Sequence, residues 1–250
     1  MDSVYESQNK NPFKLVMIRL TAMFVLAATT YAVLKLTGIS NDFPPLDALY
    51  FPFVNIICGI VIWREFRRHK VSVWRYLGFE KGRIGKDIGW GFLWLFVTYI
   101  PMVIVLMAGT YLMFGAEMFQ NFEHIFAKSS PGLPKEILMT TSLFGAVLFL
   151  INAPIEEIVY RGWLQNGLAK RWGIAVAIAV QGLLFGLQHM MFASDWRGMV
   201  IYGLMFMAWG MTAGVIVHRQ QRLAPMAVAH WIVNIALGVG PTMALALLAA

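Results

Sequence analysis

Long apolar runs recur along this chain, and they constrain its fold more than any other feature of the sequence. A run of roughly 17–25 apolar residues is long enough to cross the hydrocarbon core of a bilayer as a helix. Such runs lie near 13–37, 46–63, 88–114, 137–159, 173–192, 198–217 and 225–248. Hydrophobic residues make up 59% of the chain and charged residues only 13%, more apolar surface than a soluble fold of 250 residues could bury. We therefore predict an all-α, polytopic membrane helical bundle with about seven transmembrane helices.

The amphipathic stretch 116–127 leaves the helix count open. It is the candidate for an eighth or re-entrant membrane segment, which would move the C-terminus to the other side. The second apolar run is short and is interrupted by Pro52.

Basic residues indicate the orientation of the chain. The link 64–87 is rich in Lys and Arg, and Lys10, Lys14 and Arg19 stand at the start of the first run. The links on the opposite side hold few basic residues, so the positive-inside rule predicts a cytoplasmic N-terminus in the cell membrane. The net charge of +7 is topology information on this interpretation, and nucleic acid is not an expected partner.

Two adjacent carboxylates close the fourth apolar run. Ionisable groups inside a span are costly, so Glu156 and Glu157 are candidate site residues. On a helix, Glu157 and Arg161 lie four positions apart and can form an ion pair. Glu156 lies on a different face of that helix, and Tyr160, four positions later, shares this face.

Histidines stand in two further runs. His189 follows Phe185 by four positions in the fifth run, and Asn234 follows His230 by four in the seventh. If the fourth and fifth runs form a hairpin that turns near Trp172, Glu156 and His189 face each other at one level, because each residue of a helix rises by about 1.5 Å.

Three short motifs therefore stand in order along the second half of the chain. They are Glu156-Glu157-x-x-x-Arg161, Phe185-x-x-x-His189 and His230-x-x-x-Asn234. In order and inside predicted spans, they resemble the signatures of the CAAX-protease and bacteriocin-processing family of intramembrane proteases, which includes the CAAX prenyl endopeptidase. The resemblance covers roughly residues 137–240. We accordingly divide the chain into N-terminal transmembrane helices with a basic cytoplasmic link, 1–130, and a catalytic helical core, 131–250.

The resemblance implies a glutamate-type intramembrane endopeptidase. In that family the first glutamate and the second-motif histidine hold and activate a water molecule, and the third-motif pair stabilises the oxyanion. Carried over, the first pair is Glu156 and His189, and the second is His230 and Asn234.

The other motif residues are expected to support this site. The resemblance gives Glu157 and Arg161 the role of orienting Glu156. Tyr160 lies on the Glu156 face of the helix, and the ring of Phe185 can pack against the imidazole of His189.

A metal site is the alternative chemistry for the same side chains. Glu156, His189 and His230 offer carboxylate and imidazole ligands, a set that zinc accepts. The chain lacks His-Glu-x-x-His, the usual helical zinc motif. No cofactor is assigned with certainty, and zinc stays open.

The leading function is cleavage of membrane-anchored peptides or proteins, prenylated CAAX-type peptides among them, with the lipid bilayer as the other partner. A non-catalytic bacteriocin-immunity or peptide-binding membrane protein is the first alternative. A small transporter or channel lined by the same polar groups is the second, and it predicts Glu156 substitutions that alter flux without affecting any cleavage.

Overall fold

A computed structural model gives the fold and describes residues 2–126, 132–193, 195–240 and 242–243. The described residues form helices and no strand. The longer helices are α1 (Asp2–Lys10), α2 (Lys14–Leu36), α3 (Phe51–Arg68), α4 (Val73–Leu77), α5 (Ile84–Phe114), α6 (Met118–Phe126), α7 (Lys135–Glu156), α8 (Asn166–Trp172), α9 (Ile174–His189), α10 (Trp196–Gln220) and α11 (Ala224–Asn234). Two π-helical segments, Glu157–Gln165 and Ile235–Val239, continue α7 and α11.

The predicted helical membrane bundle is confirmed. Among the described residues, five helical stretches are long and apolar enough to cross a membrane, and a shorter apolar helix, Ala224–Val239, follows them. The five stretches are Lys14–Leu36, Val73–Phe122, Lys135–Trp172, Ile174–Phe192 and Trp196–Gln220.

All seven predicted runs coincide with helices, but two of these helices fall short of a full apolar span. The second run is α3, whose last turns carry charged residues up to Arg68. The seventh run is α11 with its π-helical continuation, and the end of that run, 244–248, lies outside the described residues. The candidate for an eighth segment, 116–127, contains α6, which at 9 residues is too short to cross a bilayer.

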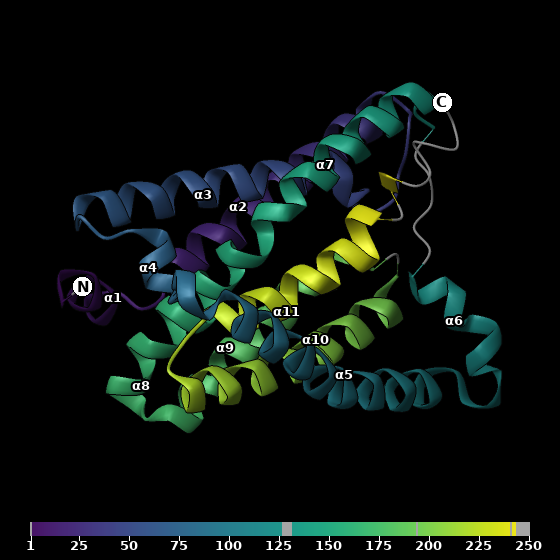
Figure 1. The fold of residues 1–250 in the computed structure, drawn as a ribbon. Helices are drawn as coiled ribbons and strands as arrows, with labels where there is room; N and C mark the ends of the chain where they lie inside the picture. Colours follow the sequence, from purple (N-terminus) through teal and green to yellow (C-terminus); the bar gives the residue numbers. More distant parts are fainter. Residues whose placement is uncertain (1, 127–131, 194, 241, 244–250) are drawn as a thin grey trace.

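Helices α9 and α10 form the inner part of the bundle. In each of them 44% of the residues in the most apolar 18-residue stretch are buried. The corresponding share is 17–22% for the stretches that contain α2, α5 and α7. Helix α10 packs against α9 and α5, and α11 runs between α5 and α7 (Figure 1). The outer helices therefore have more exposed apolar side chains than the inner ones, and the inner helix α9 carries the second motif.

Glycines allow α9 and α10 to approach closely. A Cβ atom at Gly186 would collide with the carbonyl oxygen of Gly203, and one at Gly182 would lie 2.6 Å from Cγ of Met211. Small residues at helix contacts are a common means of packing in membranes. This contact fixes the position of Phe185 and His189, which stand on the same helix.

Helix α1, which we did not predict, packs against the end of the α7–α8 hairpin arm. Gln8 Nε2 donates to the carbonyl of Gly162 at 3.1 Å, and Trp163 Nε1 donates to the carbonyl of Asn11 at 3.0 Å. The N-terminal segment is thus bound to the second half of the chain.

Candidate active site

The α7–α9 hairpin turns where the sequence predicts it. Helix α8 ends at Trp172, Gly173 takes a positive φ of 79°, and α9 begins at Ile174. Glycine adopts a positive φ without steric cost, so it can separate the two helices at this turn. The hairpin brings Glu156, at the end of α7, beside the end of α9.

Glu156 is fully buried, and its two carboxylate oxygens differ in their surroundings. Oε1 accepts hydrogen bonds from Arg19 Nη2 at 2.5 Å and from Gln188 Nε2 at 2.6 Å. Oε2 accepts no hydrogen bond and lies 3.5 Å from His230 Nε2. One oxygen is therefore held by the protein, and the other is free to accept a proton.

The imidazole of His189 is fixed by its own helix and by an aromatic ring. Its Nδ1 lies 2.7 Å from the carbonyl of Phe185, so Nδ1 is the nitrogen that carries a proton and Nε2 is left as the acceptor. The ring stacks on Phe206 of α10, with centroids 3.7 Å apart and an interplanar angle of 11°. The predicted contact with the Phe185 ring is present, at 4.5 Å between centroids.

His230 lies between the two adjacent glutamates. Its Nδ1 is 2.9 Å from Glu157 Oε1, and its Nε2 faces Glu156 Oε2. The predicted pair of Glu157 and Arg161 is also present, at 3.2 Å. We expected Glu157 and Arg161 to orient Glu156. In the structure Glu157 instead contacts His230, and Glu157 is not among the residues that form hydrogen bonds with Glu156.

The remaining motif residues enclose this centre. Asn234 Nδ2 donates to the carbonyl of Phe149 on α7, at 3.4 Å. The Arg161 guanidinium lies over the Phe185 ring, 4.2 Å from its centroid. The hydroxyl of Tyr160 donates to Gln188 Oε1 at 2.9 Å, so Tyr160 reaches Glu156 only through Gln188.

The four candidate catalytic residues line one cavity of about 600 Å³. Glu156, His189, His230 and Asn234 form a polar patch on its wall, together with Asn152. Most of the other lining side chains are apolar, and they come from α5, α9, α10 and α11 among other elements. A polar cluster on an apolar wall can bind a largely apolar ligand and orient it.

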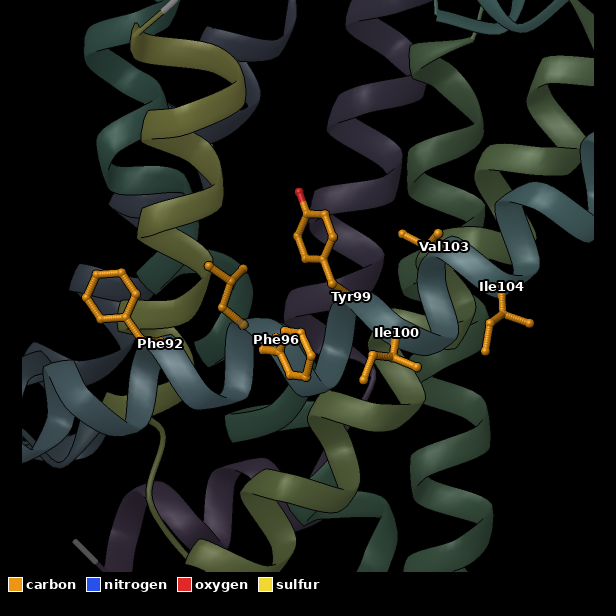
Figure 2. Close-up of a pocket in the computed structure, with 7 residues that line it drawn as sticks. Phe92, Phe96, Tyr99, Ile100, Val103 and Ile104 are labelled. Atoms are coloured by element: carbon orange, nitrogen blue, oxygen red, sulfur yellow. The ribbon is translucent and has the colours of Figure 1, made fainter. Parts of the chain in front are cut away.

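A shallow apolar groove runs along the outer face of α5 and meets this cavity. Figure 2 shows the groove, with Tyr99 and Val103 on one side of the helix and Ile100 and Ile104 on the other. Tyr99 and Val103 line both the groove and the cavity. Tyr99 and Val103 thus separate the cavity with the polar cluster from the apolar groove on α5.

The predicted zinc ligands do not form a metal site as they are placed. In the part of the chain that the structure describes, no group of three His, Cys, Asp or Glu side chains is arranged to hold a metal ion. Glu156 Oε1 instead contacts the guanidinium of Arg19, a permanent cation that would repel Zn²⁺ at the same oxygen. We therefore derive no chemical step through a metal.

Sequence reasoning missed four polar residues that contact Glu156 or its partners, namely Arg19, Asn55, Asn152 and Gln188. Arg19 was counted with the basic N-terminal flank, whereas the structure buries it completely in α2. Gln188 lies inside the second motif and Asn152 lies four positions before the first, where spacing along the chain alone does not indicate a contact with Arg19. The rule that an ionisable group inside a span marks a site would have found Arg19, since it lies within the first apolar run.

Comparison with known families agrees with this geometry. Residues 138–236 match the family described as type II CAAX prenyl endopeptidase Rce1-like. This segment is similar to the CAAX protease family. The match contains all three motifs and therefore every predicted catalytic residue. Searches of curated proteins and of solved structures give no match. The chain is thus a multi-pass membrane protein with a segment similar to CAAX-type proteases, and residues 1–137 and 237–250 lie outside the match.

Proposed function

We propose that the chain is a glutamate-type intramembrane endopeptidase that hydrolyses membrane-anchored peptides, prenylated CAAX-type peptides among them. The cavity is the observation that carries the proposal. Its lining includes the Glu156 carboxylate, two imidazoles and the Asn234 carboxamide among mostly apolar side chains. These are the groups that peptide hydrolysis needs as a base and as oxyanion donors.

Glu156 and His189 activate the water in this proposal. Glu156 Oε2 and His189 Nε2 are both acceptors, and both residues line the cavity. A water molecule held between them attacks the carbonyl carbon of the scissile peptide bond while Glu156 takes one of its protons.

His230 and Asn234 stabilise the tetrahedral intermediate. Asn234 has a second amide hydrogen besides the one directed at Phe149, and His230 donates through Nε2 when both ring nitrogens carry protons. Donors fixed in an apolar pocket favour the negative charge that develops on the carbonyl oxygen. The carbon–nitrogen bond then breaks, and the proton on Glu156 passes to the departing amine.

The groove on α5 supports entry of the substrate from the bilayer. A membrane-anchored peptide would place its lipid or apolar segment on α5 and pass between Tyr99 and Val103 into the cavity. Both residues belong to the two spaces at once. This route would deliver a peptide to Glu156 without exposing the cavity broadly to water.

We further propose that the N-terminus is cytoplasmic, in the cell membrane. The basic link 64–87 supports this orientation. Its Lys81 is exposed, and the single native cysteine, Cys58, is buried. A Lys81→Cys variant in intact cells should resist an impermeant thiol reagent until the membrane is opened, and labelling of intact cells would reverse the orientation.

Peptide cleavage by the purified protein in bilayers tests the function. We expect the wild type to cut members of a library of prenylated and unmodified membrane peptides, and Glu156→Ala and His189→Ala to cut none. Glu136→Ala and His218→Ala are matched controls, because both residues are exposed, Glu136 lies near the start of α7 and His218 lies on α10, which carries no motif. A folded wild type that binds peptides and cuts none would instead favour the peptide-binding or immunity function.

A further inference from the structure

Among the described residues that form a hydrogen bond or ion pair with Glu156, Arg19 is the one that comes from outside the family match. It stands in α2 and is fully buried, 137 positions before its partner. Its guanidinium cannot lose its charge at ordinary pH, so the fold must compensate a permanent cation inside the bundle. The acceptors that compensate this charge indicate the role of Arg19.

Every nitrogen of the guanidinium has an acceptor in the described structure. Nε donates to Gln188 Oε1 at 2.5 Å and Nη1 donates to Asn55 Oδ1 at 3.2 Å. Nη2 donates both to Asn152 Oδ1 at 2.9 Å and to Glu156 Oε1. The planar fork of arginine suits such a divergent set of acceptors, and a lysine ammonium would not reproduce it.

The contacts fix Glu156 at one oxygen only. Arg19 and Gln188 both donate to Oε1, and Arg19 also holds the side-chain oxygen of Gln188. The Gln188 amide is thereby oriented with its NH₂ group toward Glu156. The whole arrangement leaves Oε2 beside His230, without a hydrogen bond.

We propose that Arg19 is a positioning residue that selects Glu156 Oε2 as the oxygen that acts on the water. This inference rests on the proposed protease function. It assigns to the N-terminal half of the chain a part in the active site that the three motifs do not contain. Because Arg19 is not among the residues that line the cavity, it acts through Glu156 and does not contact substrate.

A purely structural role would be the alternative. Arg19 joins α2 to α3, α7 and α9 through its partners, and loss of these bonds could simply loosen the bundle. The two roles differ in what a conservative variant does. Arg19→Lys keeps the cation next to Glu156 and loses the fork that aligns Gln188 and Asn152.

The kinetics of Arg19→Lys in bilayers decide between the positioning role and the structural role. Arg67→Lys, at an exposed position on α3, is the control. We expect kcat to fall by about 10²-fold, as for a misplacement of about 1 Å in a reacting group, with KM and the melting temperature close to those of the wild type. A kcat equal to that of the wild type, or a loss of activity that follows the loss of folded protein, would overturn the inference.

A thermal cycle covers the case in which the Arg19 variants fold poorly or the wild type cuts no peptide. Arg19→Met is compared in the wild-type and the Glu156→Gln backgrounds. We expect a clear fall in melting temperature in the wild-type background, where Arg19→Met leaves the Glu156 carboxylate unpaired. The fall should be much smaller in the Glu156→Gln background, which has no carboxylate at this position. Equal falls in both would show that Arg19 does not act on Glu156. Absence of cleavage by the wild type, by contrast, contradicts the proposed function and leaves this cycle to decide the role of Arg19.

Discussion

The indole Nε1 of Trp231 on α11 donates a hydrogen bond to the carbonyl of Leu150 on α7, at 2.5 Å. This carbonyl is free because its helical partner would be the N–H of residue 154, which is a proline. Pro154 therefore does more than interrupt α7: it provides an acceptor that binds the neighbouring helix. The bond lies next to His230 on one helix and close to Glu156 on the other, so it sets how the third motif faces the first.

Replacement of Trp231 by Phe should lower stability and activity together. The ring is kept, but Leu150 loses its donor, at a cost of about 0.5–1.5 kcal/mol in the free energy of unfolding. Thermal unfolding and the cleavage rate of the same preparation are the measurements. Trp196→Phe, at a side chain that is 63% exposed, should leave both unchanged, and equal effects of the two substitutions would contradict this role for Trp231.

Removal of an oxyanion donor should act on kcat. Asn234→Ala is expected to lower kcat by about 10²–10³-fold with little change in KM, because the donor is needed most when charge develops on the carbonyl oxygen. Steady-state kinetics with one peptide measure both constants. Asn166→Ala, at an exposed position in α8, is the control. If KM alone rose, Asn234 would be a substrate-binding residue.

Closer contact between α9 and α10 should not be tolerated. Gly186→Ala places a methyl group against the backbone of α10 and should cost about 1–3 kcal/mol of stability. Gly89→Ala on α5 meets no atom within 4 Å and should be neutral or slightly stabilising. Melting temperatures of the two variants in the same detergent test the difference, and a Gly186→Ala protein as stable as the wild type would show that the helices can separate without cost.

Narrowing of the proposed entrance should raise KM. Val103 lines both the groove and the cavity, whereas Ile104, one position on, lines the groove alone. Val103→Trp is therefore expected to raise KM for long membrane peptides and to leave kcat near its wild-type value, and Ile104→Trp should change neither. The route along α5 would be refuted by a Val103→Trp enzyme with an unchanged KM.

Chelation separates the two candidate chemistries. The contacts of Glu156 with Arg19 and Gln188 do not fit a zinc ion, so cleavage should survive exhaustive treatment with a chelator. Activity that is lost on chelation and restored by zinc alone would revive Glu156, His189 and His230 as ligands.

The sequence predicted the elements of the candidate site better than the contacts within it. Spacing along a helix places Glu157 next to Arg161, and it places Phe185 next to His189, because these contacts are local. It could not predict that Glu157 bonds to His230 or that Arg19 bonds to Glu156, since such contacts depend on how distant helices pack. Arg19 illustrates the difficulty: a cation near the start of an apolar run reads equally as a topology signal or as a buried partner.

Helix ends were hard to predict for a related reason. The sequence pattern marks where apolar residues stop, but the described α11 gives way to π-helical turns within its apolar run, and α3 continues into charged residues. Composition also gives no signal for α1, a polar segment that is held by the bond from Gln8 to Gly162 and, just after the helix, by the bond from Trp163 to Asn11.

The most direct test of the central claim is the kcat of Glu156→Gln in bilayers, compared with that of Glu136→Gln. Both substitutions remove one carboxylate from α7 and keep the size of the side chain, and only the first touches the cavity. We predict a fall of about 10²–10⁴-fold for Glu156→Gln, the range expected for a general base, and no change for Glu136→Gln. Cleavage by folded Glu156→Gln at close to the wild-type rate would contradict the account.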